Sequence, residues 1–183
     1  MTLPVALDFK HYAHVGVSVE KPQIPDFVRK VAAEHGLTEK DKVHISVVVT
    51  KNARLLWEAV AAKENPEAFV HSIKSLFESY LWEYSLTDEY FLHERTYTRD
   101  DLRDNGYSDE IPGHTRRTIV QKVELPDLSE FYEKLNDMFG ISLPAPVPHI
   151  TLFAWSDYES FKIRGIGINS EEEFKRFTKE AVR

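Results

Sequence analysis

The sequence contains one order of features twice, and this repetition limits the folds that the chain can adopt. A strand pattern leads to a Pro-Asp pair, an amphipathic helical pattern and a second strand that carries a histidine. Asp26 and His44 mark the first copy, and Asp127 and His149 mark the second, so that the aspartates lie 101 positions apart and the histidines 105. This nearly constant spacing predicts two related units that face each other about a pseudo-two-fold axis. Two unrelated strand–helix–strand units would also give this order, because such units are common.

Strand and helix patterns are interspersed along the chain and predict an α+β fold. The expected strands cover 13–19, 43–50, 118–125, 149–155 and 161–168, with one or two more within 82–97. The expected helices cover 26–35, 53–62, 66–80 and 127–139, and a last helix opens at Ser170 with Glu173 as its capping-box partner. We expect two pseudo-symmetric lobes, each an antiparallel sheet with flanking helices, that face a central cleft. They would form a single bilobal domain over residues 1–183, with motif strands at 43–50 and 149–155.

The composition excludes several classes of site and partner. The chain has 183 residues, of which 42% are hydrophobic and 29% charged, and this is enough for a folded core. It has no cysteine, so disulfides, thiolate metal sites and cysteine nucleophiles are impossible. The formal net charge of −7 contrasts with the basic excess of proteins that follow a long nucleic acid. A small anionic ligand held by a local site is therefore expected rather than a nucleic-acid polymer, and a short RNA end is also compatible.

The sequence also lacks signals for membranes and secretion. No apolar run approaches the roughly 18 residues that a membrane helix needs. The first residues do not combine a basic start with a long apolar stretch, as a secretory signal does. We expect a cytoplasmic protein with no membrane partner.

Both histidine strands begin with a histidine, an apolar residue, a hydroxyl residue and another apolar residue. The first contains His44 and Ser46, and the second contains His149 and Thr151. Side chains alternate between the two faces of a strand, so each histidine shares a face with its hydroxyl residue while the apolar residues point to the other face. By the same alternation, Val48 would lie on the face of the first histidine and Phe153 on the face of the second.

Two histidines that face one cleft can supply the two proton transfers of phosphodiester hydrolysis. A base removes a proton from the nucleophile, and an acid protonates the leaving alkoxide. The ordinary pKa of imidazole is about 6.5, so that one ring can be neutral and the other protonated near neutral pH. The Ser46 and Thr151 hydroxyls can hydrogen-bond the non-bridging phosphate oxygens. We expect His44 and His149 to be catalytic and the two hydroxyl residues to bind phosphate, with no metal and no cofactor.

The pair His44-Ile45-Ser46-Val47 and His149-Ile150-Thr151-Leu152 resembles the twin signature of the 2H phosphoesterase superfamily. That superfamily includes bacterial RNA 2′,5′-ligase-like proteins, plant cyclic phosphodiesterases and eukaryotic RNA-processing phosphodiesterases. The resemblance covers most of the chain and implies a bilobal fold and metal-independent hydrolysis of 2′,3′-cyclic or related phosphodiesters. The family's catalytic histidines match His44 and His149, and its phosphate-binding hydroxyls match Ser46 and Thr151. The motifs continue with Val-Val-Thr-Lys and Phe-Ala-Trp-Ser rather than with the Phe-Leu-Gly type of ending of the ligase-like members.

Several residues near the motifs are candidates for substrate contacts, because a phosphate favours a cation and a base or sugar favours an aromatic side chain. The candidates are Tyr12, His14, Arg116, Arg117, Trp155 and Tyr158. An ordinary surface or core position is the alternative for each of them. The polar, turn-rich segment 98–113 is a candidate mobile lid at the mouth of the cleft.

Two other functions are compatible with the sequence. The chain could be a catalytically silent nucleotide-binding or sensor module that uses the same cleft, or a metal-dependent hydrolase with histidine ligands. Metal analysis would separate the second alternative from the leading hypothesis. Turnover of 2′,3′-cyclic nucleotides with and without a chelator would separate the first.

Overall fold

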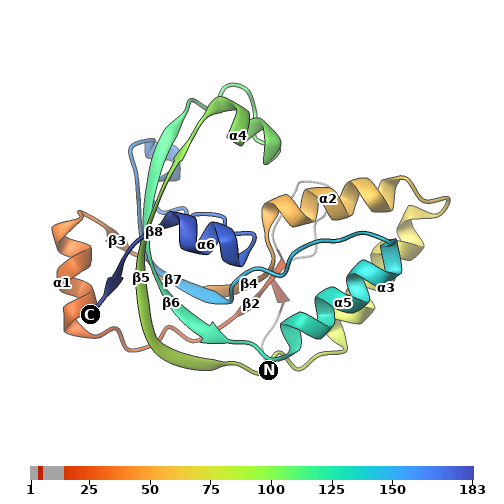
Figure 1. The fold of residues 1–183 in the computed structure, drawn as a ribbon, viewed down its shortest axis with the longest axis horizontal. Coiled ribbons are helices and arrows are strands. Elements are labelled where there is room, and N and C mark those ends of the chain that lie inside the picture. Colours follow the sequence, from red (N-terminus) through yellow and green to blue (C-terminus); the bar gives the residue numbers. More distant parts are fainter. Residues whose placement is uncertain (1–3, 6–14) are drawn as a thin grey trace.

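The chain has an α+β fold, as the sequence predicts, in a computed structural model that describes residues 4–5 and 15–183 (Figure 1). Over these residues, eight strands form one hydrogen-bonded sheet whose paired neighbours are all antiparallel. The strands are β1 (Pro4–Val5), β2 (Val15–Ser18), β3 (Thr38–Glu39), β4 (His44–Val48), β5 (Ser85–Tyr97), β6 (His114–Glu124), β7 (His149–Ser156) and β8 (Thr178–Val182). The helices are α1 (Asp26–Glu34), α2 (Thr50–Ala61), α3 (Pro66–Glu78), α4 (Arg99–Asp104), α5 (Asp127–Phe139), the short η2 (Glu159–Phe161) and α6 (Glu171–Phe177).

The sheet places the two histidine strands side by side near its centre. The strand order is β1-β2-β4-β7-β6-β5-β8, and β3 also pairs with β7. Ile45 of β4 lies opposite Ile150 of β7. The long strands β5 and β6 curve strongly beside them (Figure 1). The arrangement therefore brings together two motifs that are far apart in the sequence.

The pairing of β2 with β4 contains a one-residue shift directly after the first motif. Gly16 pairs with Ser46 and Val15 pairs with Val48, so that Val47 is an additional residue on β4. This is the pattern of a β-bulge, which interrupts the regular alternation of side chains. Val48 consequently belongs to the hydrophobic core together with Val47. The expectation that it shares the face of the first histidine is wrong for this reason.

The pairing of β6 with β7 contains the same shift at the same place in the second motif. Val120 pairs with Thr151 and Ile119 pairs with Phe153, so that Leu152 is the additional residue. Phe153 lies in the core together with Leu152 and Ile119. The expectation that it shares the face of the second histidine is therefore also wrong. Both motifs have an identical register relative to their partner strands.

Helices α1 and α5, which follow the two Pro-Asp pairs, end in the same way. Gly36 and Gly140 follow them with φ angles of 63° and 64°, in the left-handed region that glycine adopts without strain. The Leu37 N–H donates to Ala32 O, and the Ile141 N–H donates to Asn136 O. These bonds are typical of the glycine-terminated helix ends that reverse the chain.

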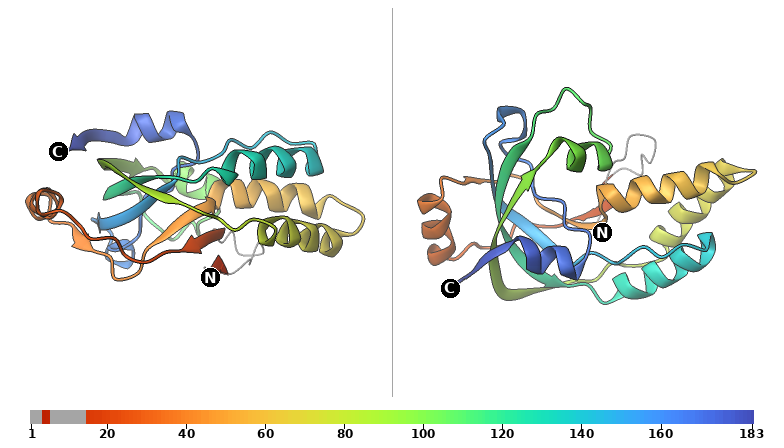
Figure 2. Two further views of the ribbon diagram at one scale, coloured as in Figure 1. Left: turned by 90° about the horizontal axis from the view of Figure 1, so that it is seen from below. Right: turned by 45° about the horizontal axis from the view of Figure 1, so that its top comes forward.

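The helices gather mainly at the ends of the sheet. Figure 1 shows α1 at one end and α2, α3 and α5 at the other, and the further views in Figure 2 show these three helices side by side. Leu56 of α2, Ile73 of α3 and Phe131 of α5 join Ile45 and Ile150 in the main core cluster. None of the described helices is long and apolar enough to cross a membrane.

Four segments differ from the sequence-based expectations. The segment 161–168 is not a strand: after η2 it has no regular structure, because the Gly165 and Gly167 carbonyls accept hydrogen bonds from arginine side chains. The candidate lid 98–113 contains α4, whose first turn is closed by a capping box between Thr98 and Asp101. The strands β3 and β8 were not predicted, since each has at most five residues and little alternation.

Candidate active site

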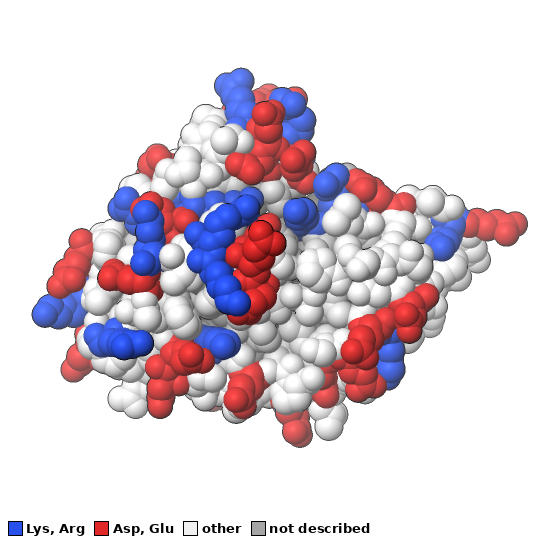
Figure 3. All heavy atoms as spheres, in the orientation of Figure 1, with Lys and Arg blue, Asp and Glu red and all other residues white. Residues whose placement is uncertain are grey.

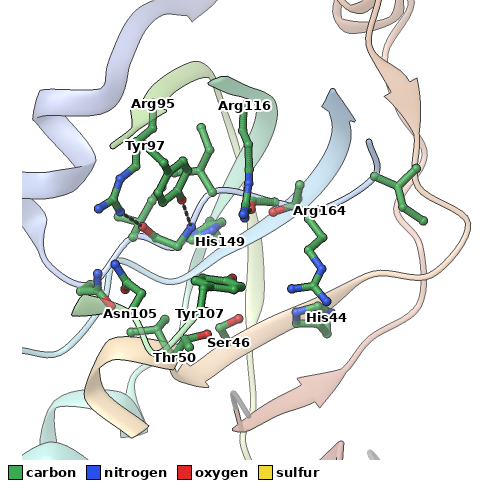
Figure 4. Close-up of a pocket in the computed structure, with 18 of the residues that line it drawn as sticks. His44, Ser46, Thr50, Arg95, Tyr97, Asn105, Tyr107, Arg116, His149 and Arg164 are labelled. Atoms are coloured by element: carbon green, nitrogen blue, oxygen red, sulfur yellow. Dashed lines mark hydrogen bonds between the residues drawn. The ribbon is translucent and has the colours of Figure 1, made fainter. Parts of the chain in front are cut away.

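A pocket of about 700 Å³ opens beside the two central strands. His44, Ser46, His149 and Thr151 all line it, and Figure 4 shows how the labelled residues approach one another. The four residues come from two strands that pair directly at Ile45 and Ile150. The structure thus brings both motifs to one site.

His149 is held in a defined tautomer at the start of β7. Its Nδ1 lies 2.7 Å from the Val147 carbonyl oxygen, which can only accept, so Nδ1 carries the proton. The side chain is only 8% exposed, and this burial lowers its pKa. The ring is therefore neutral at neutral pH, and Nε2 has a free lone pair that can accept a proton.

His44 lies half-buried on β4, and the neighbouring strand makes room for its ring at Gly16. A Cβ atom at Gly16 would lie 3.4 Å from the His44 Cδ2 atom and 2.8 Å from the Ile45 carbonyl oxygen. A side chain there would displace the backbone of β4 as well as the imidazole. Figure 4 shows Arg164 extending toward this histidine.

The two motif hydroxyls are half-buried and therefore accessible to a ligand in the pocket. Gly165 allows the chain to approach one of them closely, because a Cβ at this position would lie 3.2 Å from the Thr151 Oγ1 atom. Both hydroxyls can therefore donate to an acceptor such as a phosphate oxygen.

The pocket concentrates positive charge in a protein whose net charge is −7. Lys40, Arg95, Arg116 and Arg164 line it, and its lining contains no aspartate or glutamate among the described residues. Burial lowers the pKa of Lys40. By contrast, Figure 3 shows acidic and basic side chains interspersed over one face of the molecule. The charges of the pocket favour a small anionic ligand over a nucleic-acid polymer, which needs an extended basic surface.

The other sequence-based candidates are divided between the pocket and its outside. Arg116 lines the pocket, whereas Arg117 follows it on the strand and so points to the other face. Arg117 donates to Glu94 at 2.6 Å and lies over the ring of Trp155, so neither Arg117 nor Trp155 is a lining residue. Tyr158 packs against a histidine and a phenylalanine outside the lining. Tyr12 and His14 lie outside the described residues.

Several lining residues were not among the sequence-based candidates. Arg95 and Tyr97 come from the end of β5, and Asn105 and Tyr107 come from the segment that follows α4. The expected lid segment therefore does border the pocket. Only the pairing of β5 with β6 could have indicated Arg95 and Tyr97, because neither residue belongs to a motif.

Potential metal ligands do not gather at this site or elsewhere in the described part of the chain. Across residues 4–5 and 15–183, no group of three or more His, Asp or Glu residues is placed so that it could hold a metal ion. Comparison of the chain with known protein families, with curated proteins and with solved structures gives no match. The function is therefore inferred from the geometry and chemistry of the pocket.

Proposed function

We propose that this protein is a metal-independent phosphodiesterase. Its substrate is a nucleotide or a short RNA end that carries either a cyclic phosphodiester of the 2′,3′ type or a 2′,5′-linked phosphodiester. The observation that carries the proposal is the position of two His-x-Ser/Thr motifs on adjacent central strands, with His44, Ser46, His149 and Thr151 lining one pocket. The resemblance of these motifs to the 2H phosphoesterase superfamily is consistent with it.

The fold supports a duplicated, bilobal arrangement in this proposal. Ile45 and Ile150 occupy equivalent places in the two motifs and pair with each other, as expected for two units related by a local two-fold axis. Ser46 and Thr151 are each followed by an identical register shift. Each unit would then contribute one histidine and one hydroxyl to a shared central cleft.

The hydrogen bonding of His149 favours this residue as the general base. Its Nε2 accepts a proton from a water molecule, and the water oxygen forms a bond to phosphorus. The bond from phosphorus to one ribose oxygen breaks, and His44, in its protonated form, donates a proton to that oxygen. The product is a phosphate monoester, and proton exchange with solvent restores both rings. Ser46 and Thr151 donate hydrogen bonds to the non-bridging oxygens, whose negative charge is also stabilised by Arg164, which extends toward His44.

The test is hydrolysis of 2′,3′-cyclic AMP, followed by separation of the monophosphate products, in the presence and absence of a chelator. We expect turnover that the chelator does not change. The variants His44→Ala and His149→Ala should each lower kcat by orders of magnitude, because each loses one proton transfer. The double variant should be little worse than either single one, since residues that act as a unit are not additive.

The matched control is His71→Ala, which removes an exposed histidine from α3. This variant should retain the full rate. Hydrolysis that requires a divalent ion would instead support the metal-dependent alternative. Binding of the nucleotide without any turnover would favour a sensor module.

A further inference from the structure

Two arginines occupy directly opposite positions on neighbouring strands beside the motif residues. Arg95 of β5 pairs with Arg116 of β6, and the two side chains are only 8% and 2% exposed. Like charges directly opposite each other destabilise a sheet. A buried charge without an opposite charge is also strongly unfavourable. A bound anion would therefore stabilise this arrangement.

The protein itself provides little negative charge at this place. Arg95 Nη2 lies 3.9 Å from an Asp101 carboxylate oxygen, at the limit of an ion pair. Arg116 has no carboxylate partner within residues 4–5 and 15–183. The remaining contacts are to neutral acceptors: Arg95 donates to Gly167 O at 3.0 Å, and Arg116 donates to Gly165 O at 3.2 Å.

Arg116 is also held so that one of its donor groups makes no hydrogen bond to the described residues. Its Nε donates to His114 Nε2 at 2.9 Å, and His114 Nδ1 in turn lies 2.8 Å from Pro112 O. His114 is thus a neutral acceptor that fixes the guanidinium. Arg116 Nη2 is buried without a hydrogen-bond partner in the described part of the chain, and Figure 4 shows the guanidinium directed into the pocket.

Tyr97 holds both guanidinium groups without using their N–H donors. The carbon at the centre of each guanidinium lies 4.3 Å (Arg95) and 4.6 Å (Arg116) from the centre of the tyrosine ring. The tyrosine hydroxyl accepts from the Gly167 N–H at 3.4 Å, which positions the ring. Guanidinium groups that stack on an aromatic ring keep their planar donors free for a phosphate.

The two arginines enter the pocket from strand positions that are distant from His149. The Arg116 side chain reaches the Gly165 carbonyl, and Gly165 lies against Thr151. Arg116 pairs with Ser156 at the end of β7, whereas His149 is its first residue. With a rise of about 3.3 Å per residue, these two ends are roughly 20 Å apart along the strand. The long arginine side chains extend back to the pocket, which at about 700 Å³ is larger than one phosphate requires.

We infer that Arg95 and Arg116 form a second anion subsite, which binds another phosphate group of the same substrate. The substrate class is a nucleotide with a 2′,3′-cyclic phosphate between the histidines and a 5′-phosphate at the arginines. Planar guanidinium donors match the oxygens of a phosphate. This inference rests on the proposed function for the identity of the scissile group.

The test compares two substrates that differ only at the 5′ position, 2′,3′-cyclic AMP and its 5′-phosphorylated form. In the wild-type protein, kcat/KM should be about 10- to 100-fold higher for the 5′-phosphorylated substrate. This factor corresponds to the free energy of hydrogen bonds to a charged group. Arg95→Gln should reduce this preference toward one, and Arg95→Lys should retain part of it. Because the preference is a ratio on one protein sample, partial misfolding does not change it.

The matched control is Arg117→Gln, which removes the same charge from the other face of β6. It should retain the wild-type preference. Equal kcat/KM for both substrates in the wild-type protein would overturn the inference, as would a preference that survives in Arg95→Gln. Either result would leave the phosphodiesterase activity itself established.

A second measurement tests the subsite independently of turnover. Titration calorimetry should show that adenosine 2′,5′-bisphosphate binds more tightly than 2′-AMP, and that Arg95→Gln removes this difference. If neither cyclic substrate is hydrolysed but the difference in binding is present, the proposed function fails and the subsite stands. If the two ligands bind equally, the subsite is refuted whatever the enzyme activity.

Discussion

Ile45 and Ile150 lie opposite each other where the two motif strands pair, and both are fully buried. Each separates the histidine and the hydroxyl residue of its own motif by one position. Because the two isoleucines point into the core, the residues on either side of them point to the pocket. The core and the proposed catalytic groups are therefore set by the same alternation, and a change in the register of one strand would disturb both.

Replacing Gly16 by Ala tests how closely β2 and β4 must approach. The new Cβ would lie 2.8 Å from the Ile45 carbonyl oxygen and close to the His44 ring, so the strands must shift. We expect the free energy of unfolding to fall by about 1–3 kcal/mol, as in overpacked sites, and turnover to fall because His44 moves. Denaturant unfolding and steady-state kinetics measure the two effects. Gly167→Ala is the stability control, because its Cβ would meet no atom of the described residues within 4 Å.

The motifs and helix ends of the repeat could be predicted from the sequence, because each is defined by residues that are neighbours in the chain. The alternation around His44 and His149 identifies strands, and Gly36 and Gly140 mark the ends of the helices that precede them. The register shifts could not be predicted, since a bulge is defined by the partner strand. They moved Phe153 into the core, against the simple alternation.

The positions of Arg95 and Arg116 in the pocket could not be predicted for a related reason. Arg95 and Arg116 are 21 positions apart in the sequence, and only the β5–β6 pairing places them opposite each other. The segment 161–168 was also expected to form a strand. Its carbonyl groups at Gly165 and Gly167 bind the arginines instead of a neighbouring strand.

Removing the motif hydroxyls should weaken catalysis less than removing the histidines. Ser46→Ala and Thr151→Val each delete one donor to a phosphate oxygen, so we expect a loss of roughly 1–3 kcal/mol in transition-state binding. Steady-state kcat/KM on 2′,3′-cyclic AMP measures it. Thr96→Ala is a suitable control, because this exposed threonine bonds only to Thr115 among the side-chain contacts of the described residues. A loss as large as that of a histidine variant would mean that the hydroxyl takes part in proton transfer.

The segment that contains α4 is expected to exchange its amide hydrogens faster than β4 and β7. The helix has only six residues, and Leu102 is its one buried side chain. Asn105 and Tyr107, which follow it, line the pocket, so a bound nucleotide should slow their exchange. Hydrogen-exchange mass spectrometry with and without 2′-AMP measures both effects. Protection equal to that of the central strands in the free protein would contradict a role as a lid.

Acid should destabilise the fold in part through His93. This side chain is 0% exposed, and burial, followed by repulsion from His149, lowers its pKa to about 3. Between about pH 6.5 and 3 the unfolded chain binds a proton that the folded protein does not, so stability falls as the pH falls, by up to about 1.4 kcal/mol per pH unit. Burial lowers the pKa of His114 and His149 as well, and both act in the same direction.

The variant His93→Phe should reduce this pH dependence. The His93 ring already packs between Phe91 and Phe174, and its Nδ1 has no hydrogen-bond partner among residues 4–5 and 15–183. A phenylalanine can therefore replace it, at the loss of the contact with Thr178. Urea unfolding between pH 4 and 7 measures the slope. An unchanged slope would show that His93 is not the group that takes up the proton on unfolding.

The pH dependence of catalysis should reflect the environment of His149. The proposed base must be neutral, and burial lowers its pKa, so kcat/KM should fall with acid only below the ordinary imidazole pKa of about 6.5. At alkaline pH the rate should fall again, because the acid loses its proton. Initial rates on 2′,3′-cyclic AMP from acid to alkaline pH give the profile. Far-UV circular dichroism of each sample separates titration from the acid unfolding expected for His93, since a titrated enzyme keeps the spectrum of the folded protein. An acid limb centred at or above pH 6.5 would exclude a buried imidazole as the base and would transfer that role to His44.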